Sequence, residues 1–146
     1  MIRIAVAPEP IDLAAELAAI EAGGAGGIAS FTGLVRADDG VTELELEHYP
    51  GMTEAALTEL AESATQRWSL LGATIIHRVG RMRPGERIVF VATAALHRRE
   101  ALDACAFLID RLKTGAPFWK RERRGEDAAW VEAKVSDDAA AGRWGA

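Results

Sequence analysis

Two amphipathic segments that enclose a pair of β-branched runs constrain the fold of this chain most tightly. Apolar residues recur about every four positions over residues 51–71 and again over residues 98–113, which predicts two helices, the first closed by Gly72. Between them, residues 73–79 and 87–96 are rich in β-branched side chains and flank an Arg-Pro-Gly-Glu turn, a pattern that predicts a hairpin. We therefore expect both helices to pack on a sheet that contains this hairpin.

Shorter segments complete the pattern. Strand-like alternation or β-branched enrichment occurs at residues 2–6, 28–35, 41–49 and 130–135. An alanine-rich helix opens at Pro10-Ile11-Asp12 and runs to about Ala22. Asp38-Asp39-Gly40 supplies a turn between the second and third strand segments, so we expect those two to form a hairpin with one solvent-facing side. After Pro117 we expect a loop.

The length of 146 residues fits one domain with a sizeable core. We expect that domain over residues 1–135, in the α/β (α+β) class, with mostly antiparallel strands in hairpins packed with about three helices. Residues 136–146 are small and polar apart from Trp144, and we expect a flexible tail unless that tryptophan docks on a neighbour.

Charge and cysteine usage limit the functions that fit. The formal net charge of −5 argues against nonspecific binding to nucleic acid or to an anionic membrane. From Lys113 to Arg124 the balance reverses, because Glu122 is the one acid among several basic residues. This local reversal indicates a small anionic ligand. Cys105 is the single cysteine, and we see no signal peptide or membrane-spanning segment, so we expect a cytoplasmic protein.

The first candidate site is His97-Arg98-Arg99, where a predicted strand ends and a helix begins. A helix N-terminus offers unpaired N–H groups and a partial positive charge, and arginine and histidine added there make an anion site suited to phosphate. Basic residues at this end oppose the helix dipole unless an anion compensates. A solvated pair of surface arginines is the alternative interpretation.

The second candidate site contains Lys113 and Lys120, separated by Pro117-Phe118-Trp119. Aromatic neighbours that remove water from Lys120 would lower its pKa and make it a general acid/base or a nucleophile. The alternatives are a lysine that extends past a partly buried tryptophan and, for Lys113, a charge that caps the end of its helix.

Other residues carry weaker signals. Arg36 follows a predicted strand and either binds an anion or is a strand-end charge. Cys105 falls in an apolar helical stripe, which indicates a packing residue. The spacings of the histidines predict no metal site, and we expect no cofactor. The glycine cluster at residues 23–27 follows a helix and precedes a strand, the reverse of a dinucleotide-binding fingerprint.

Read together, several blocks resemble the large, catalytic subunits of molybdopterin synthase, the MoaE family. The resemblance is carried, in the family's order, by Phe31-Thr-Gly-Leu-Val-Arg36, Leu46-Glu-His-Tyr-Pro-Gly-Met52, His77-Arg-Val-Gly80, His97-Arg98 with Ala101 and Ala104-Cys105, and Leu112-Lys113 through Pro117-Phe-Trp-Lys120-Arg-Glu122, ending at Trp130. These blocks cover about residues 25–132. Leu102 departs from the pattern, since an aromatic residue is common there, and so does the Asp38-Asp39-Gly40 turn, where asparagine is frequent.

The resemblance implies a hammerhead-type fold and a homodimer in which each protomer binds a small ubiquitin-like sulfur carrier, giving a heterotetramer. It implies that two sulfurs pass from the thiocarboxylated tail of the carrier to cyclic pyranopterin monophosphate, forming the dithiolene of molybdopterin. The family's pocket residues fall on Arg36, His97 and Arg98 for substrate binding and on Lys113 and Lys120 for catalysis. The competing hypothesis is a non-catalytic module that uses the same cations to bind a phosphorylated metabolite or a partner's C-terminal carboxylate.

Overall fold

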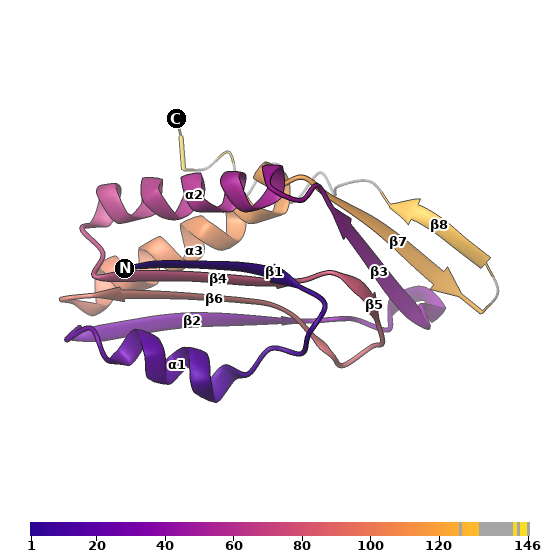
Figure 1. Ribbon diagram of the computed structural model, residues 1–146, viewed down its shortest axis with the longest axis horizontal. Coiled ribbons are helices and arrows are strands. Elements are labelled where there is room, and N and C mark those ends of the chain that lie inside the picture. The colour runs from indigo at the N-terminus through magenta and orange to yellow at the C-terminus, as the bar shows by residue number, and fades with distance from the viewer. Residues whose placement is uncertain (126, 132–141, 143, 146) are drawn as a thin grey trace.

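The computed structural model describes residues 1–125, 127–131, 142, 144 and 145. Strands and helices alternate along these residues (Figure 1). Their bounds are β1 Ile2–Ala7, α1 Leu13–Glu21, β2 Gly27–Leu34, the 3-10 helix η1 Asp38–Gly40, β3 Glu43–His48, α2 Met52–Trp68, β4 Gly72–Arg78, β5 Gly80–Met82, β6 Arg87–Ala95, α3 Arg98–Gly115, β7 Phe118–Arg124 and β8 Asp127–Val131.

The strands form two four-stranded sheets. The first has the order β1-β4-β6-β2, and within it β1 and β4 pair in parallel while the other neighbours are antiparallel. The second has the order β5-β3-β7-β8 and is antiparallel throughout. Mostly antiparallel strands packed with three α-helices confirm the predicted fold class.

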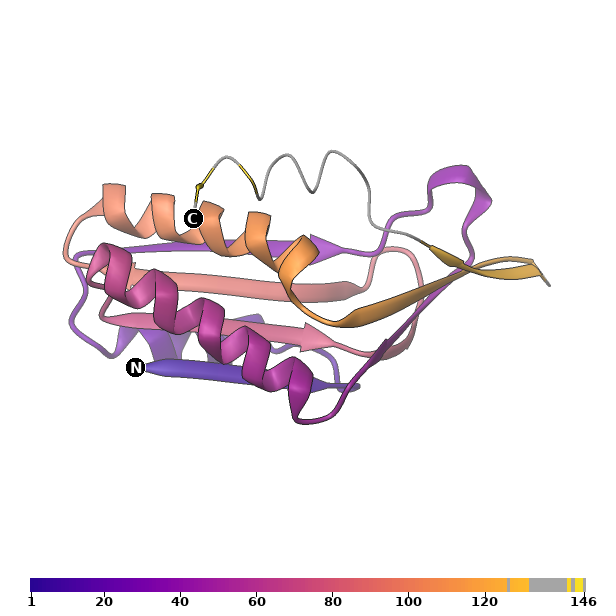
Figure 2. The same ribbon diagram turned by 90° about the horizontal axis from the view of Figure 1, so that it is seen from above.

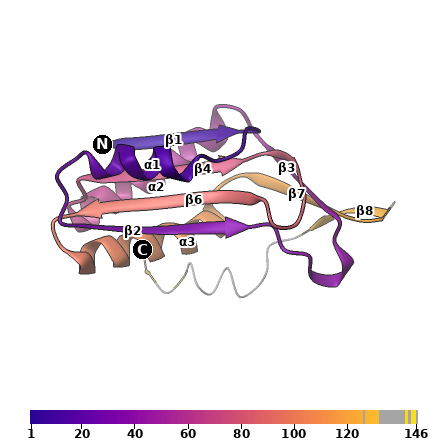
Figure 3. The same ribbon diagram turned by 90° about the horizontal axis from the view of Figure 1, so that it is seen from below.

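Helices cover both faces of the first sheet (Figures 1 and 2). α2 and α3 lie side by side on one face, where Leu57, Val91 and Leu108 belong to the main core cluster. α1 lies on the opposite face, as the view from below shows (Figure 3), and buries Ile20 against Phe90 and its neighbours. The burial of these apolar side chains is the main term that holds the helices to the sheet.

The first predicted hairpin is wrong. Residues 28–35 and 41–49 were expected to pair, but β2 pairs with β6 in the first sheet and β3 pairs with β5 and β7 in the second. The Asp38–Gly40 turn instead carries the chain from one sheet to the other. Alternation specifies which face of a strand is buried, but it does not specify the partner strand. The second predicted hairpin is confirmed, because β4 and β6 pair antiparallel with β5 inserted between them in the sequence.

The loop expected after Pro117 is also wrong, because residues 118–124 form strand β7. Residues 120–124 of this strand are all charged and show no apolar alternation, and the strand is held by cross-strand ion pairs such as Arg123 Nε to Glu43 Oε1 at 3.1 Å. The strand expected at residues 130–135 overlaps the end of β8, and residues 132–135 lie outside the described residues.

The end of α2 differs from the sequence prediction, whereas the start of α1 agrees with it. α2 ends at Trp68, not at Gly72, because Ser69 adopts the left-handed conformation (φ 51°) and closes the helix. Asp12 does open α1, and its carboxylate accepts a hydrogen bond from the Ala15 N–H at 3.1 Å.

Trp144 docks on its own chain, between α2 and α3. Its ring packs edge-on against Trp68 and Phe107, each at a centroid distance of 5.7 Å, and its Nε1–H donates to Asp110 Oδ2 at 2.6 Å. Most of the predicted tail, including residues 136–141, lies outside the described residues, so its flexibility stays a prediction. Among the helices of the described ranges, none has both the length and the apolar character needed to cross a bilayer.

Candidate active site

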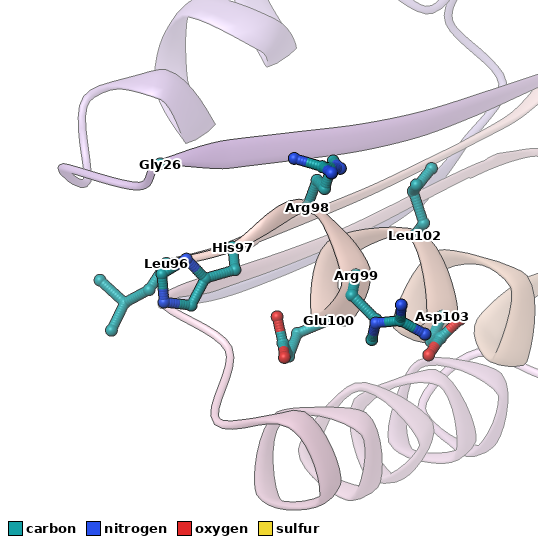
Figure 4. A pocket seen from close by; sticks show the side chains of 8 residues that line it. All are labelled: Gly26, Leu96, His97, Arg98, Arg99, Glu100, Leu102 and Asp103. Atoms are coloured by element: carbon teal, nitrogen blue, oxygen red, sulfur yellow. The ribbon is translucent and has the colours of Figure 1, made fainter.

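An open hollow lies at the N-terminus of α3, where the chain leaves β6 (Figure 4). It is lined by Gly26, Leu96, His97, Arg98, Arg99, Glu100, Leu102 and Asp103. His97 is the N-cap residue, with extended backbone angles (φ −128°, ψ 152°), and its side chain makes no capping hydrogen bond. This side chain therefore leaves the first N–H groups of α3 to other partners, and the helix dipole makes an anion favourable there.

The two arginines of the hollow point in different directions. Arg98 extends toward β2, on the side of α3 that also carries Leu102, whereas Arg99 extends toward Asp103 (Figure 4). Asp103 follows Arg99 by four residues on α3, a spacing at which opposite charges attract each other. Arg98 is thus the better placed of the two to bind an anionic ligand.

The glycine cluster has a packing role that the sequence analysis missed. A Cβ atom on Gly26 would lie 2.1 Å from the Leu96 carbonyl oxygen, and one on Gly27 would lie 3.2 Å from the Arg98 Cα. Glycine here lets the start of β2 approach the start of α3 closely. The available signal was the position of the glycines immediately before a strand, where close backbone approach is a common reason for glycine.

Lys113 and Lys120 lie at the opposite end of α3. Lys113 is exposed in the last turn of the helix, and Lys120 lies on β7 opposite Leu46. The Lys120 side chain is 40% exposed, and its Nζ lies 3.6 Å from Glu122 Oε1. Trp119, the expected aromatic wall, projects from the other face of β7 and packs against Tyr49. Within one protomer, Trp119 therefore does not shield Lys120 from water.

His77 is a buried residue beside the lysines whose role the sequence analysis did not identify. Its ring stacks on Phe118 at a centroid distance of 4.1 Å, and its Nδ1 lies 2.9 Å from the Arg78 carbonyl oxygen. Burial lowers the pKa of His77 to about 4, against the opposing effect of the Arg78 hydrogen bond and with help from the charges of Lys113 and His48. His77 is therefore neutral near pH 7, and its Nδ1–H donates to the Arg78 carbonyl.

β2 ends at Leu34, at the end of the first sheet nearest the second sheet (Figure 2), and Arg36 follows it by two residues. Its side chain is 65% exposed, and its Nε lies 3.2 Å from Asp38 Oδ2. An exposed ion pair of this kind contributes little to stability, so Arg36 can exchange Asp38 for another anion at small cost.

One protomer does not bring the five predicted site residues together. α3 has 18 residues and is roughly 27 Å long at 1.5 Å per residue. His97 and Arg98 lie at its N-terminus, whereas Lys113 lies in its last turn. Arg36 and Lys120 lie near the C-terminal end of α3, together with Lys113, and this region is called the lysine end below. The cations therefore form two separate groups on the protomer.

Among the described residues, neither a reactive thiol nor a metal site is found. Cys105 is buried in the core under α3, and burial raises the pKa of its thiol to about 11. A thiol of that kind is inert, as the apolar stripe predicted. In the described part of the chain, no three histidine, cysteine or acidic side chains are grouped closely enough to hold a metal ion.

Comparisons with known proteins point to one family. The family model of the MoaE protein matches residues 6–115. A molybdopterin synthase catalytic subunit from Ralstonia nicotianae is 51% identical over 99% of this chain and 85% of its own length. The solved structure of a molybdopterin biosynthesis MoaE protein from Burkholderia ambifaria superposes with a TM-score of 0.87 at 47% identity, covering 100% of this chain and 99% of its own. A complex of subunits 1 and 2 of the molybdopterin-converting factor from Helicobacter pylori shares the fold (TM-score 0.76, 19% identity, 91% of each chain).

Proposed function

The chain belongs to the MoaE family, and on that basis we propose that it is a molybdopterin synthase catalytic subunit that acts as a sulfurtransferase. In this proposal, sulfur passes from the thiocarboxylated C-terminus of a small carrier protein to cyclic pyranopterin monophosphate and forms the molybdopterin dithiolene. The observation that carries the proposal is the pair of cationic groups at the two ends of α3, because the reaction joins two anions, a phosphate ester and a thiocarboxylate.

The hollow at the start of α3 suits the phosphate of the pterin. Arg98 and His97 provide side-chain donors beside the first N–H groups of the helix, and a bound phosphate would offset the unfavourable placement of Arg98 at the positive end of the dipole. Glu100 lies on the same rim, so we expect the donors to hold the single charge of the cyclic phosphate without attracting further anions. Arg36 would support the same anion from the strand end of a second protomer, because within one protomer it lies at the far end of β2.

The lysine end suits the carrier tail. Lys113 orients the terminal carbonyl of the carrier, and Lys120 transfers a proton or forms a transient covalent attachment as oxygen leaves the pterin. Each thiocarboxylate that gives up its sulfur returns as a carboxylate, so two carriers serve one pterin. Sulfur comes from the carrier, which is consistent with the inert, buried Cys105. We place this chemistry in the cytoplasm, where such a thiol stays reduced.

A second protomer brings the two cationic groups together in this proposal. β2 is an edge strand of the first sheet, and Leu34 on β2 and Leu102 on α3 are 53% and 60% exposed. A two-fold axis across this apolar edge would place the Arg98 end of one protomer against the lysine end of the other. A carrier bound at each lysine end of such a dimer would make a heterotetramer.

A reconstituted reaction tests the function directly. The purified chain is mixed with a thiocarboxylated carrier and cyclic pyranopterin monophosphate, and products are followed by mass spectrometry. We expect the gain of two sulfur atoms per pterin. Tight binding of the pterin or of the carrier with no sulfur incorporation would instead support the non-catalytic anion-binding module.

A further inference from the structure

Residues 114–119 connect Lys113 to Lys120, and this short segment, called the lysine link below, is held by several contacts. Within it, the Phe118 N–H donates to the Ala116 carbonyl at 3.0 Å, which makes a tight turn around Pro117. The Phe118 ring, just beyond this turn, stacks on the buried ring of His77. The direction in which β7 leaves α3, and so the position of Lys120 relative to Lys113, is set at this turn.

Thr53 supplies a further contact to this turn from a different part of the chain. Its side chain is fully buried, and its hydroxyl donates to the Pro117 carbonyl at 2.9 Å while accepting from the Tyr49 N–H at 3.0 Å. A hydroxyl has one proton, so this pair of bonds uses it as a donor to the lysine link and as an acceptor from the end of β3. The link is thereby tied to both α2 and β3.

We propose that Thr53 is a positioning residue for sulfur transfer, which fixes the Pro117 turn and through it the relative placement of Lys113 and Lys120. The proposal rests on the function proposed above. Thr53 touches neither lysine in the described contacts, and it acts through the Pro117 carbonyl. Small displacements of reacting groups lower rates strongly, so a loosened turn should affect the chemical step more than binding of the phosphate at the far end of α3.

Replacing the hydroxyl without changing the shape of the side chain tests this role. We expect Thr53→Val to lower kcat by about 10- to 100-fold, with the KM for the pterin within about 2-fold of wild type. Thr53→Ser keeps the hydroxyl and should restore kcat to within about 3-fold of wild type. Hydrogen exchange at the Tyr49 amide should quicken in the valine variant and not in the serine variant.

Thr65→Val is the matched control. Thr65 lies on the same helix, and its hydroxyl donates to the Ala61 carbonyl at 2.7 Å, with no contact to the lysine link. We expect its kcat to equal that of wild type. If Thr53→Val does not fold, Thr53→Cys takes its place, since a thiol keeps the side-chain size but is a weak donor, and it should lower kcat as well.

The outcomes separate this inference from the proposed function. Wild-type protein that produces no dithiolene overturns the function itself. Active wild-type protein combined with an unchanged kcat in folded Thr53→Val or Thr53→Cys overturns the role of Thr53. A low kcat in Thr53→Ser also overturns it, because the loss would then follow from packing of the methyl group.

Discussion

Arg36 and Arg98 lie at opposite ends of strand β2. Gly27 begins the strand against the Arg98 backbone, and Arg36 follows its last residue, Leu34, by two positions. Eight residues of β-strand span roughly 23 Å, which is too far for both guanidinium groups to hold one phosphate. If both arginines serve the same substrate, they come from two protomers, and every prediction about the site must be made for the dimer.

Lys120→Ala should abolish most of the turnover. Loss of a proton-transfer group typically costs about 100-fold or more in kcat, and the fold should persist because Lys120 is partly exposed and, among the described residues, forms an ion pair with Glu122. Dithiolene formation and carrier binding are measured in parallel. Arg124→Ala is the matched control, since Arg124 donates to the same Glu122 at 2.9 Å. Wild-type turnover in Lys120→Ala would remove this lysine from the mechanism.

Arg98→Ala should weaken pterin binding. A charge-assisted hydrogen bond contributes about 1.5–3 kcal/mol, so we expect the dissociation constant for the cyclic pterin to rise by about 10- to 100-fold in calorimetric titration. Arg99→Ala removes the neighbouring guanidinium, which points toward Asp103 (Figure 4), and should change the constant by less than about 3-fold. Equal losses in the two variants would mean that the hollow attracts anions by net charge alone.

His77 should make the protein less stable in mild acid. Its pKa is about 4 when folded and about 6.5 when unfolded, so between these values the unfolded chain binds a proton that the folded chain does not. The free energy of unfolding should therefore fall as the pH is lowered from 6.5 toward 4, by up to about 1.4 kcal/mol per pH unit from this residue. Urea denaturation between pH 5 and pH 7.5 should show a flatter dependence for His77→Asn. Identical slopes would contradict the burial of a neutral imidazole.

Cys105 should be unreactive and dispensable for sulfur transfer. With a thiol pKa of about 11, roughly one molecule in a thousand carries the thiolate at pH 8, and burial also blocks access. Iodoacetamide should label the folded protein far more slowly than the protein in urea, and Cys105→Ala should retain turnover. A folded Cys105→Ala variant that still binds the carrier but transfers no sulfur would show that this chain, and not only the carrier, handles the sulfur atom.

Local patterns predicted the individual elements better than their pairing. The helices at residues 98–113 and 10–22 and the β4–β6 hairpin follow from periodicity and turn residues that lie close together in the sequence. The pairing of β3 with β7 joins Glu43 to Arg123 across most of the chain, and no local signal marks it. Strand β7 was not predicted because residues 120–124 are all charged and show no apolar alternation, and their ion pairs with β3 are not evident from the sequence.

The site residues show the same difference between local features, which the sequence predicts, and long-range contacts, which it does not. Helix-start and helix-end chemistry located His97, Arg98 and Lys113 at their places on α3, and the structure confirms those places. The resemblance also implied that these residues line one pocket. That is a statement about distances between side chains, and a single sequence contains no information on such distances. Thr53 and His77 were missed because a buried threonine and a buried histidine in regular elements look like ordinary core residues until their partners are known.

Complementation between two inactive variants tests the shared site most directly. Arg98→Ala and Lys120→Ala proteins are unfolded together, refolded as a mixture and assayed for dithiolene formation. If each site takes Arg98 from one protomer and Lys120 from the other, about half of the dimers are mixed and each mixed dimer has one intact site, so activity should return to about a quarter of wild type. If both residues act within one protomer, every site carries a defect, and a mixture no more active than the two variants alone would contradict the account.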